Sequence, residues 1–152
     1  MFESIVVGTD GSDSAAVAVK KATDLAKLCG ATLHIVSAYR PVSISGVAMA
    51  AGAGAATIDT EAVNQSVAAQ SSLVCEHASS NARRDGVKVE MHSVPGEPAD
   101  VLIGVAEEFH ADLVVVGNRG MSGARRFILG SVPNKVSHHC PCSLLIVDTA
   151  KA

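Results

Sequence analysis

Residues 111–120 read ADLVVVGNRG, and nine residues separate Gly120, at the end of this stretch, from Gly130. The run from Leu113 to Val116 is short, continuously apolar and rich in β-branched residues. Such a run is typical of a central parallel strand that is covered on both faces. It ends at Gly117, so the stretch predicts a buried strand followed directly by a glycine-rich loop.

The glycines at positions 117, 120 and 130 let the backbone come close to a bulky anion. Ser131 follows the last of them and occupies an N-cap position before the apolar residues of the next helix. The N–H groups of a helix N-terminus attract phosphate without a lysine. The spacing therefore predicts a phosphate-binding loop. An alternative remains open at this stage, in which the glycines only shape a loop.

Strand and helix patterns alternate along the whole chain of 152 residues, which we interpret as one domain, residues 1–152. The other strands are expected at residues 4–9, 31–38, 87–94 and 142–147, and the other helices begin near Ser12, Glu61 and Pro98. This alternation predicts an α/β fold: a doubly wound, five-stranded parallel sheet with helices on both faces. Residues 41–60 are expected to form a long loop with a mobile Ala/Gly-rich middle.

The composition excludes several classes of function. Apolar residues make up 48% of the chain and aromatic residues only 3%, and the formal net charge is −3. An acidic chain without a basic run is not expected to bind nucleic acid or an anionic membrane. Residues 1–8 enter a strand without a signal-peptide pattern, and no membrane span is predicted, so the expected location is cytoplasmic.

Residues 138–142 read HHCPC and raise the question of a zinc site, because imidazole and thiolate are zinc ligands. No second Cys/His pair stands at zinc-finger spacing. Pro141 is better interpreted as the break between a helix and the final strand. No metal site is therefore predicted.

In doubly wound sheets, ligands bind outside the carboxyl ends of the strands where the winding reverses. Strand 4–9 ends with Gly8 and Thr9, and Asp10 follows it. We place this strand beside the one that ends at Gly117. Asp10 is expected at the buried edge of the site, where it would accept a bond from a ribose hydroxyl or help hold a magnesium ion. The other interpretation of Asp10 is an Asx turn that begins the first helix.

These residues resemble the universal stress protein family of the nucleotide-binding kind. The opening residues 5–12, IVVGTDGS, match the family's first strand and turn. The glycine pattern at 117, 120 and 130 with a hydroxyl residue at 131 matches without a gap, as does Cys140-Pro141 before the last strand. The resemblance covers essentially the whole chain and implies the adenine-nucleotide α-hydrolase-like fold, with the strand order 3-2-1-4-5.

The resemblance implies an adenine-nucleotide-binding regulatory protein of the stress response, with ATP or cyclic AMP as the ligand. The implied nucleotide-binding residues are Gly8, Thr9, Asp10, Val36, Val116, Gly117, Arg119, Gly120, Gly130, Ser131 and Val132. Thr9 and Asp10 would hold the ribose, Val36 would border the adenine, and Arg119 is the only candidate cation near the phosphates. Pro133 departs from the family pattern and removes one N–H donor. No catalytic residue is predicted, and at most slow ATP hydrolysis is expected.

Two other functions stay open. One is a nucleotide-independent dimeric interaction protein, and the other is an ATP-using adenylating or pyrophosphatase enzyme, which the run from Thr9 to Ser14 distantly suggests. The final strand carries no lysine or proline that would blunt a sheet edge. Together with the family resemblance, this strand predicts a homodimer that pairs through residues 142–148.

Overall fold

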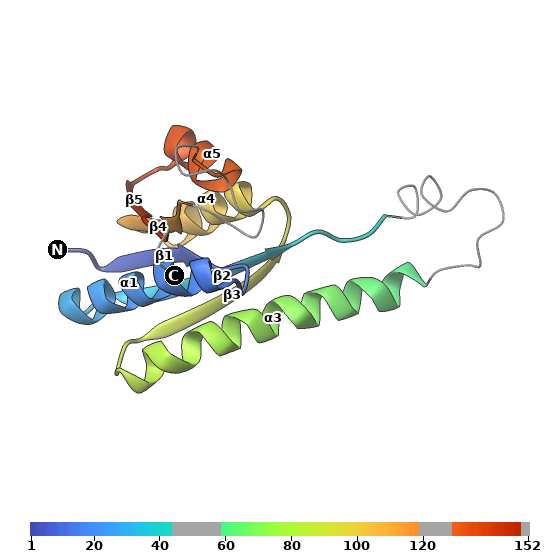
Figure 1. The fold of residues 1–152 in the computed structure, drawn as a ribbon, viewed down its shortest axis with the longest axis horizontal. Coiled ribbons are helices and arrows are strands. Elements are labelled where there is room, and N and C mark those ends of the chain that lie inside the picture. Colours follow the sequence, from blue (N-terminus) through green and yellow to red (C-terminus); the bar gives the residue numbers. More distant parts are fainter. Residues whose placement is uncertain (44–58, 119–128, 150–152) are drawn as a thin grey trace.

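The computed structural model describes residues 1–43, 59–118 and 129–149. Five parallel strands form one sheet in the order β3-β2-β1-β4-β5. The strands are β1 (Ser4–Gly8), β2 (Thr32–Tyr39), β3 (Val89–Pro95), β4 (Leu113–Gly117) and β5 (Ser143–Val147), and the helices are α1 (Asp13–Cys29), α3 (Thr60–Arg84), α4 (Pro98–Glu108) and α5 (Ser131–His139) (Figure 1). The predicted fold class and strand order are confirmed.

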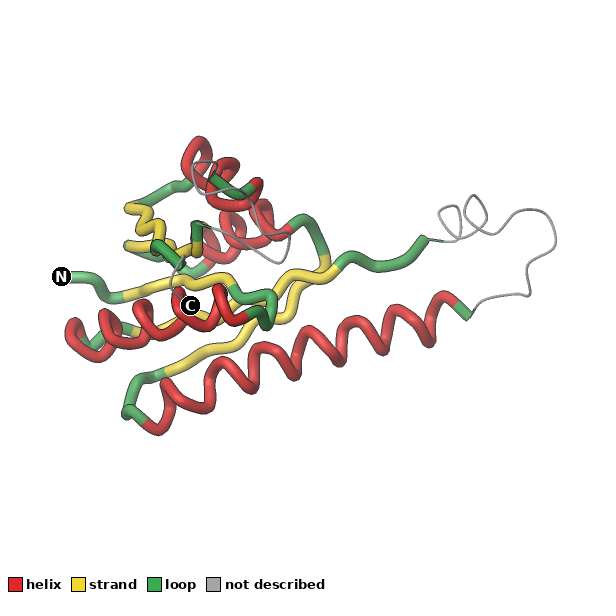
Figure 2. Tube along the Cα trace, viewed as in Figure 1, coloured by secondary structure: helices red, strands yellow, loops and turns green. Residues whose placement is uncertain are grey.

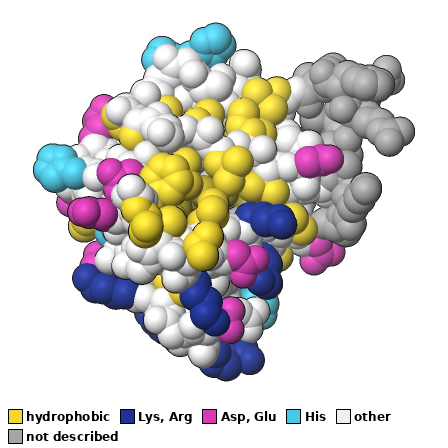
Figure 3. Space-filling view, turned by 90° about the vertical axis from the view of Figure 1, so that its left-hand side faces the viewer, with side chains coloured by type: hydrophobic (Ala, Val, Ile, Leu, Met, Phe, Trp, Pro, Cys, Tyr) yellow, Lys and Arg dark blue, Asp and Glu magenta, His cyan; other side chains and the backbone are white. Residues whose placement is uncertain are grey.

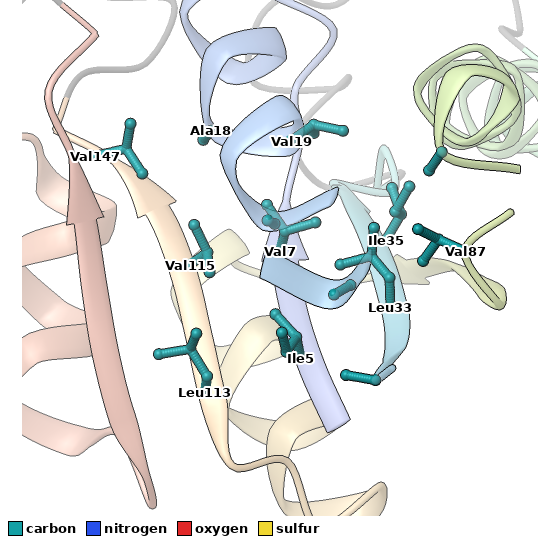
Figure 4. Close-up of a cluster of buried hydrophobic side chains, with 14 of the residues drawn as sticks. Ile5, Val7, Ala18, Val19, Leu33, Ile35, Val87, Leu113, Val115 and Val147 are labelled. Carbon is teal, nitrogen blue, oxygen red and sulfur yellow. The ribbon is translucent and has the colours of Figure 1, made fainter. Parts of the chain in front are cut away.

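Alternation of side chains along the strands builds two apolar cores. Ile5 and Val7 of β1 pack with α1 and α3, and Figure 4 shows this core. Val6 points to the opposite face and packs with α4 and α5. Figure 2 shows the strands as a layer between these two pairs of helices. Because both faces of the strands are buried, their sequences read as continuous apolar runs.

The ends of α1 follow local rules. The hydroxyl oxygen of Ser12 accepts a hydrogen bond from the Ala15 N–H at 3.2 Å and caps the helix start. Gly30 ends the helix in the left-handed region with φ 69°, which a glycine adopts without strain. The predicted start and stop of this helix are therefore confirmed.

Several predicted strand boundaries shift by one or two residues. The third strand begins at Val89 and not at Val87, because the Val87 N–H donates to the Ala82 carbonyl at 3.1 Å and so belongs to the end of α3. The fifth strand begins at Ser143, whose N–H makes the first bond to the Asp112 carbonyl, at 3.3 Å. Residues 44–58 of the predicted long loop lie outside the described part of the chain.

Within the three described ranges, none of the helices combines the length and the apolar character that crossing a bilayer requires.

Asp112 joins the start of β1 to the turn before β4. Its carboxylate accepts hydrogen bonds from the N–H groups of Glu3, at 2.7 Å, and Ser4, at 3.0 Å. These bonds favour the ionised form and lower the pKa of Asp112 from its ordinary value. The unfolded chain then binds more protons than the folded chain in the window just below the ordinary value of 3.8.

We expect Asp112→Asn to lower the free energy of unfolding at pH 6 by no more than about 1 kcal/mol, because solvent screens this exposed group. Asparagine keeps an acceptor but loses the charge. The deficit should shrink as the pH falls below about 4, where the wild-type carboxylate also becomes neutral. Urea unfolding between pH 2.5 and 6 measures it. A deficit that does not change with pH would contradict this role of the charge.

Candidate functional site

A cleft of about 630 Å³ opens at the carboxyl ends of β1 and β4, where the winding of the sheet reverses. Its volume lies in the usual range for small-molecule sites. All of the predicted nucleotide-binding residues that the structure describes line it: Gly8, Thr9, Asp10, Val36, Val116, Gly117, Gly130, Ser131 and Val132. Arg119 and Gly120 lie outside the described residues. One cleft therefore collects residues from four separate segments of the chain.

The loop after β1 is held by its own polar groups. The Thr9 N–H donates to the Val36 carbonyl at 2.8 Å and extends the contact between β1 and β2. The Thr9 hydroxyl accepts from the Gly11 N–H at 3.2 Å. Thr9 is buried, so its side chain sets the shape of the loop as well as the wall of the cleft.

Asp10 is exposed, which corrects the prediction that it lies at a buried edge. Its Oδ1 accepts bonds from the N–H of Ser12, at 3.0 Å, and from the Ser12 hydroxyl, at 2.5 Å. This geometry is the Asx turn that was one of the two interpretations, and Asp10 is exposed because it lies in this turn, beyond the end of β1 at Gly8. Asp10 still lines the cleft, so the turn fixes the position of a carboxylate at its rim.

The start of α5 forms the opposite wall. Gly130 is the N-cap and Ser131 the first helical residue, so the prediction of Ser131 as N-cap is wrong by one position. The reason is that the Gly130 carbonyl already accepts the first helical bond, from Asn134 at 3.0 Å. A glycine cap has no side chain to satisfy the next N–H groups. Pro133 has no backbone N–H. The N–H groups of Ser131 and Val132 are therefore the first-turn donors available to a ligand.

Asn118 connects the loops after β4 and β5 to this helix. Its carbonyl accepts the Gly130 N–H at 3.1 Å. Its side-chain oxygen accepts from the Thr149 N–H, at 3.0 Å, and the Thr149 hydroxyl, at 2.8 Å, while its amide donates to Asp148 at 3.0 Å. A Cβ added to Gly130 would lie 3.3 Å from the Asn118 carbonyl oxygen. Asn118 therefore sets how closely the helix start approaches β4.

Arg40 is a cation of the cleft that sequence reasoning missed. It follows β2, and its guanidinium pairs with Glu97 at 2.6 Å just before α4. Arg40 is thus a cation of the cleft besides the predicted Arg119, which lies outside the described residues. No motif surrounds Arg40, and it reaches the cleft because it follows β2, which pairs with β1 along the cleft.

A second cleft, of about 420 Å³, lies between α1 and α3 and shares only Thr9 with the first. Its lining contains none of the strand-end glycines Gly8 and Gly117, and no helix begins there with a glycine cap. We therefore assign the candidate functional site to the cleft at β1, β4 and α5.

We expect Asn118→Ala to lower the free energy of unfolding by about 1–3 kcal/mol, because it leaves the partly buried Thr149 groups without their acceptor. Urea denaturation measures the change. Asn134→Ala, on the exposed side of α5, is the matched control and should change stability little. Equal stability of the wild type and Asn118→Ala would show that these bonds do not hold the two loops together.

Comparison with known proteins gives a consistent assignment. The model of the universal stress protein family matches residues 1–148. The universal stress protein Rv1636 of Mycobacterium tuberculosis is 38% identical over 97% of each chain. A universal stress protein solved in complex with cAMP is 34% identical, with a TM-score of 0.69, and the alignment covers 97% of this chain and 98% of that one. The Archaeoglobus fulgidus protein solved in complex with dAMP is 25% identical over 96% and 98% of the chains, with a TM-score of 0.65. With the glycine-lined cleft in place at the sheet's switch point, these matches show that the chain belongs to the universal stress protein family.

Proposed function

We propose that the cleft binds an adenine nucleotide, ATP or cyclic AMP, and that the protein acts as a nucleotide-responsive regulator in the stress response. The observation that carries the proposal is the convergence of strand-end glycines and a glycine-capped helix start on one cleft. The relatives solved with cAMP and with dAMP support it.

In this proposal each wall of the cleft holds one part of the ligand. Gly117, Gly130 and the N–H groups at the start of α5 would hold the phosphates, with Arg119 and Gly120 completing the loop. Thr9 and Asp10 would hold the ribose hydroxyls. Val36, which is 2% exposed, offers the apolar surface against which the adenine would pack.

The charged residues of the cleft affect which nucleotide it would bind. Among the described lining residues, Arg40 is paired with Glu97, and the carboxylate of Asp10 stands at the rim. Cyclic AMP carries a single negative charge and suits such a site. ATP carries several, so a magnesium ion held near Asp10 would offset their repulsion. Binding then changes loop order or partner choice, with at most slow hydrolysis.

Two alternatives make different predictions. A nucleotide-independent interaction protein would use its surface and leave the cleft without a ligand. An adenylating or pyrophosphatase enzyme would turn ATP over rapidly. Mass spectrometry of the small molecules that co-purify with the protein separates the three functions.

We expect Gly130→Val to weaken nucleotide binding by at least about tenfold, or about 1.4 kcal/mol. The added Cβ meets the Asn118 carbonyl oxygen, and the branched side chain occupies space that the phosphates need. Titration calorimetry with cyclic AMP, and with ATP and magnesium, measures it. Gly104→Val is the control, because an added Cβ meets no atom within 4 Å there. Unchanged binding of both nucleotides in a folded Gly130→Val protein would remove the phosphate assignment.

We further propose that the protein is a homodimer that pairs through residues 142–148. β5 is an edge strand. Ser143 donates its N–H to β4, and the Val147 carbonyl accepts from Asn118 at 2.9 Å. Because the direction of the backbone N–H and C=O groups alternates along a strand, those of Leu144 and Ile146 point away from β4. Figure 3 shows apolar side chains gathered on the side of the molecule where β5 lies. A second copy would satisfy this edge by two-fold pairing.

Ile146→Pro should give a monomer or insoluble protein, because proline removes an outward donor without breaking the ladder to β4. Ile146→Val keeps the donor and should stay dimeric. Sedimentation at micromolar concentration measures both variants. A monomeric wild type, or a proline variant that dimerises as the wild type does, would contradict this interface.

A further inference from the structure

A cluster of two histidines and one glutamate lies on the sheet away from the cleft. His34 is on β2, and Glu90 and His92 are on β3. In the parallel register, His34 pairs with Glu90, and Val36 pairs with His92. Side chains two residues apart on a strand share a face, so β3 presents both of its groups beside the imidazole of His34. One potential ligand atom from each residue lies within 4.8 Å of the others.

Two distances within the cluster are close to those between the ligands of a metal ion. His34 Nδ1 and His92 Nε2 are 3.0 Å apart, and His34 Nδ1 lies 3.8 Å from Glu90 Oε2. Ligand atoms on a tetrahedral zinc ion, at bonds of about 2.0–2.1 Å, are about 3.3 Å from one another. The two separations from His34 differ from this value by about half an ångström or less, and the third, between His92 and Glu90, lies within 4.8 Å, so a turn of the Glu90 side chain toward the rings would complete the set.

The surroundings hold the imidazoles in place. Phe109, at the end of α4, lies over both rings, with centroid distances of 4.8 Å to His34 and 4.7 Å to His92. His34 is only 4% exposed, whereas 40% of the Glu90 side chain is open to solvent. The cluster thus combines an ordered, apolar interior with one ligand at the surface through which an ion can enter.

The protonation of the pair also suits a metal. Only one hydrogen can lie between the two facing nitrogens, so one of them already presents a lone pair. Burial lowers the pKa of both His34 and His92, which keeps the rings in the neutral form that binds metals. With the ring hydrogens on the outer nitrogens, both facing atoms become ligands, and the charge of the ion is balanced in part by Glu90.

We propose that His34, Glu90 and His92 bind a divalent transition metal ion of the zinc class, with three protein ligands and a fourth position for water. Two imidazoles favour zinc, cobalt, nickel or copper over magnesium and calcium, which prefer oxygen ligands. The ion would link β3, an edge strand, to β2. The site shares no residue with the nucleotide cleft, so it does not depend on the proposed function.

The test is calorimetric titration of the chelator-treated full chain with zinc chloride, and with magnesium chloride for comparison. We expect zinc but not magnesium to bind and to raise the thermal midpoint, since an ion that binds only the folded state stabilises it. Glu90→Gln and His92→Gln should each weaken the tightest zinc site by at least about tenfold, the loss that outer-sphere changes alone can cause. Glu90 is half-exposed, so Glu90→Gln should keep the fold, and circular dichroism checks this.

Two controls separate this site from the histidines and cysteines near the end of α5. Glu107→Gln, an exposed change on α4, and the double variant His138→Gln/His139→Gln should both bind zinc as the wild type does. The first equivalent of cobalt should show no thiolate charge-transfer band. The proposal is overturned if zinc does not bind, if its tightest site is unaffected by Glu90→Gln and His92→Gln, or if cobalt shows thiolate ligation first.

Discussion

The reversal of winding between β1 and β4 is the constraint on which the site depends. The chain leaves β1 toward β2 and β3, and it leaves β4 in the other direction toward β5. The two connections therefore separate at the carboxyl edge, beyond Gly8 and Gly117. A cleft at this position is therefore a consequence of the topology. The local sequence places glycines in the walls of this cleft, so that a ligand can reach the backbone N–H groups directly.

Alternation along the strands links the cleft to the rest of the molecule. On β2, Ile35 enters the core under α1 and α3, whereas His34 and Val36 face α4. Val36 borders the cleft, and His34 belongs to the histidine cluster two residues earlier. One strand thus carries both proposed sites on one face, and α4 covers both.

The fold could be predicted from the sequence because its signals are local. The run from Leu113 to Val116, the serine cap at Ser12 and the glycine stop at Gly30 each follow from nearby residues. The cleft was predictable in outline, because glycine spacing and strand order together bring its walls to one edge. The exposure of Asp10 was not predictable, because it depends on where an Asx turn lies relative to the end of the strand.

The residues that sequence analysis missed are brought together by the pairing of strands that are distant in the sequence. Arg40 reaches the cleft because β2, which it follows, lies beside β1 in the sheet. The histidine cluster joins positions 34 and 90, which are far apart in the chain. A Glu-x-His pattern at residues 90–92 was a readable signal, since it places two potential ligands on one face of a strand. Without the pairing register, nothing indicated that His34 lies opposite.

The central claim is that the cleft at β1, β4 and α5 holds an adenine nucleotide. A crystal structure of the protein grown with cyclic AMP tests it most directly. The account predicts nucleotide density with its phosphate at the N–H groups of Ser131 and Val132 and its base against Val36. Density in the cleft between α1 and α3, or an empty cleft at saturating nucleotide, would contradict it.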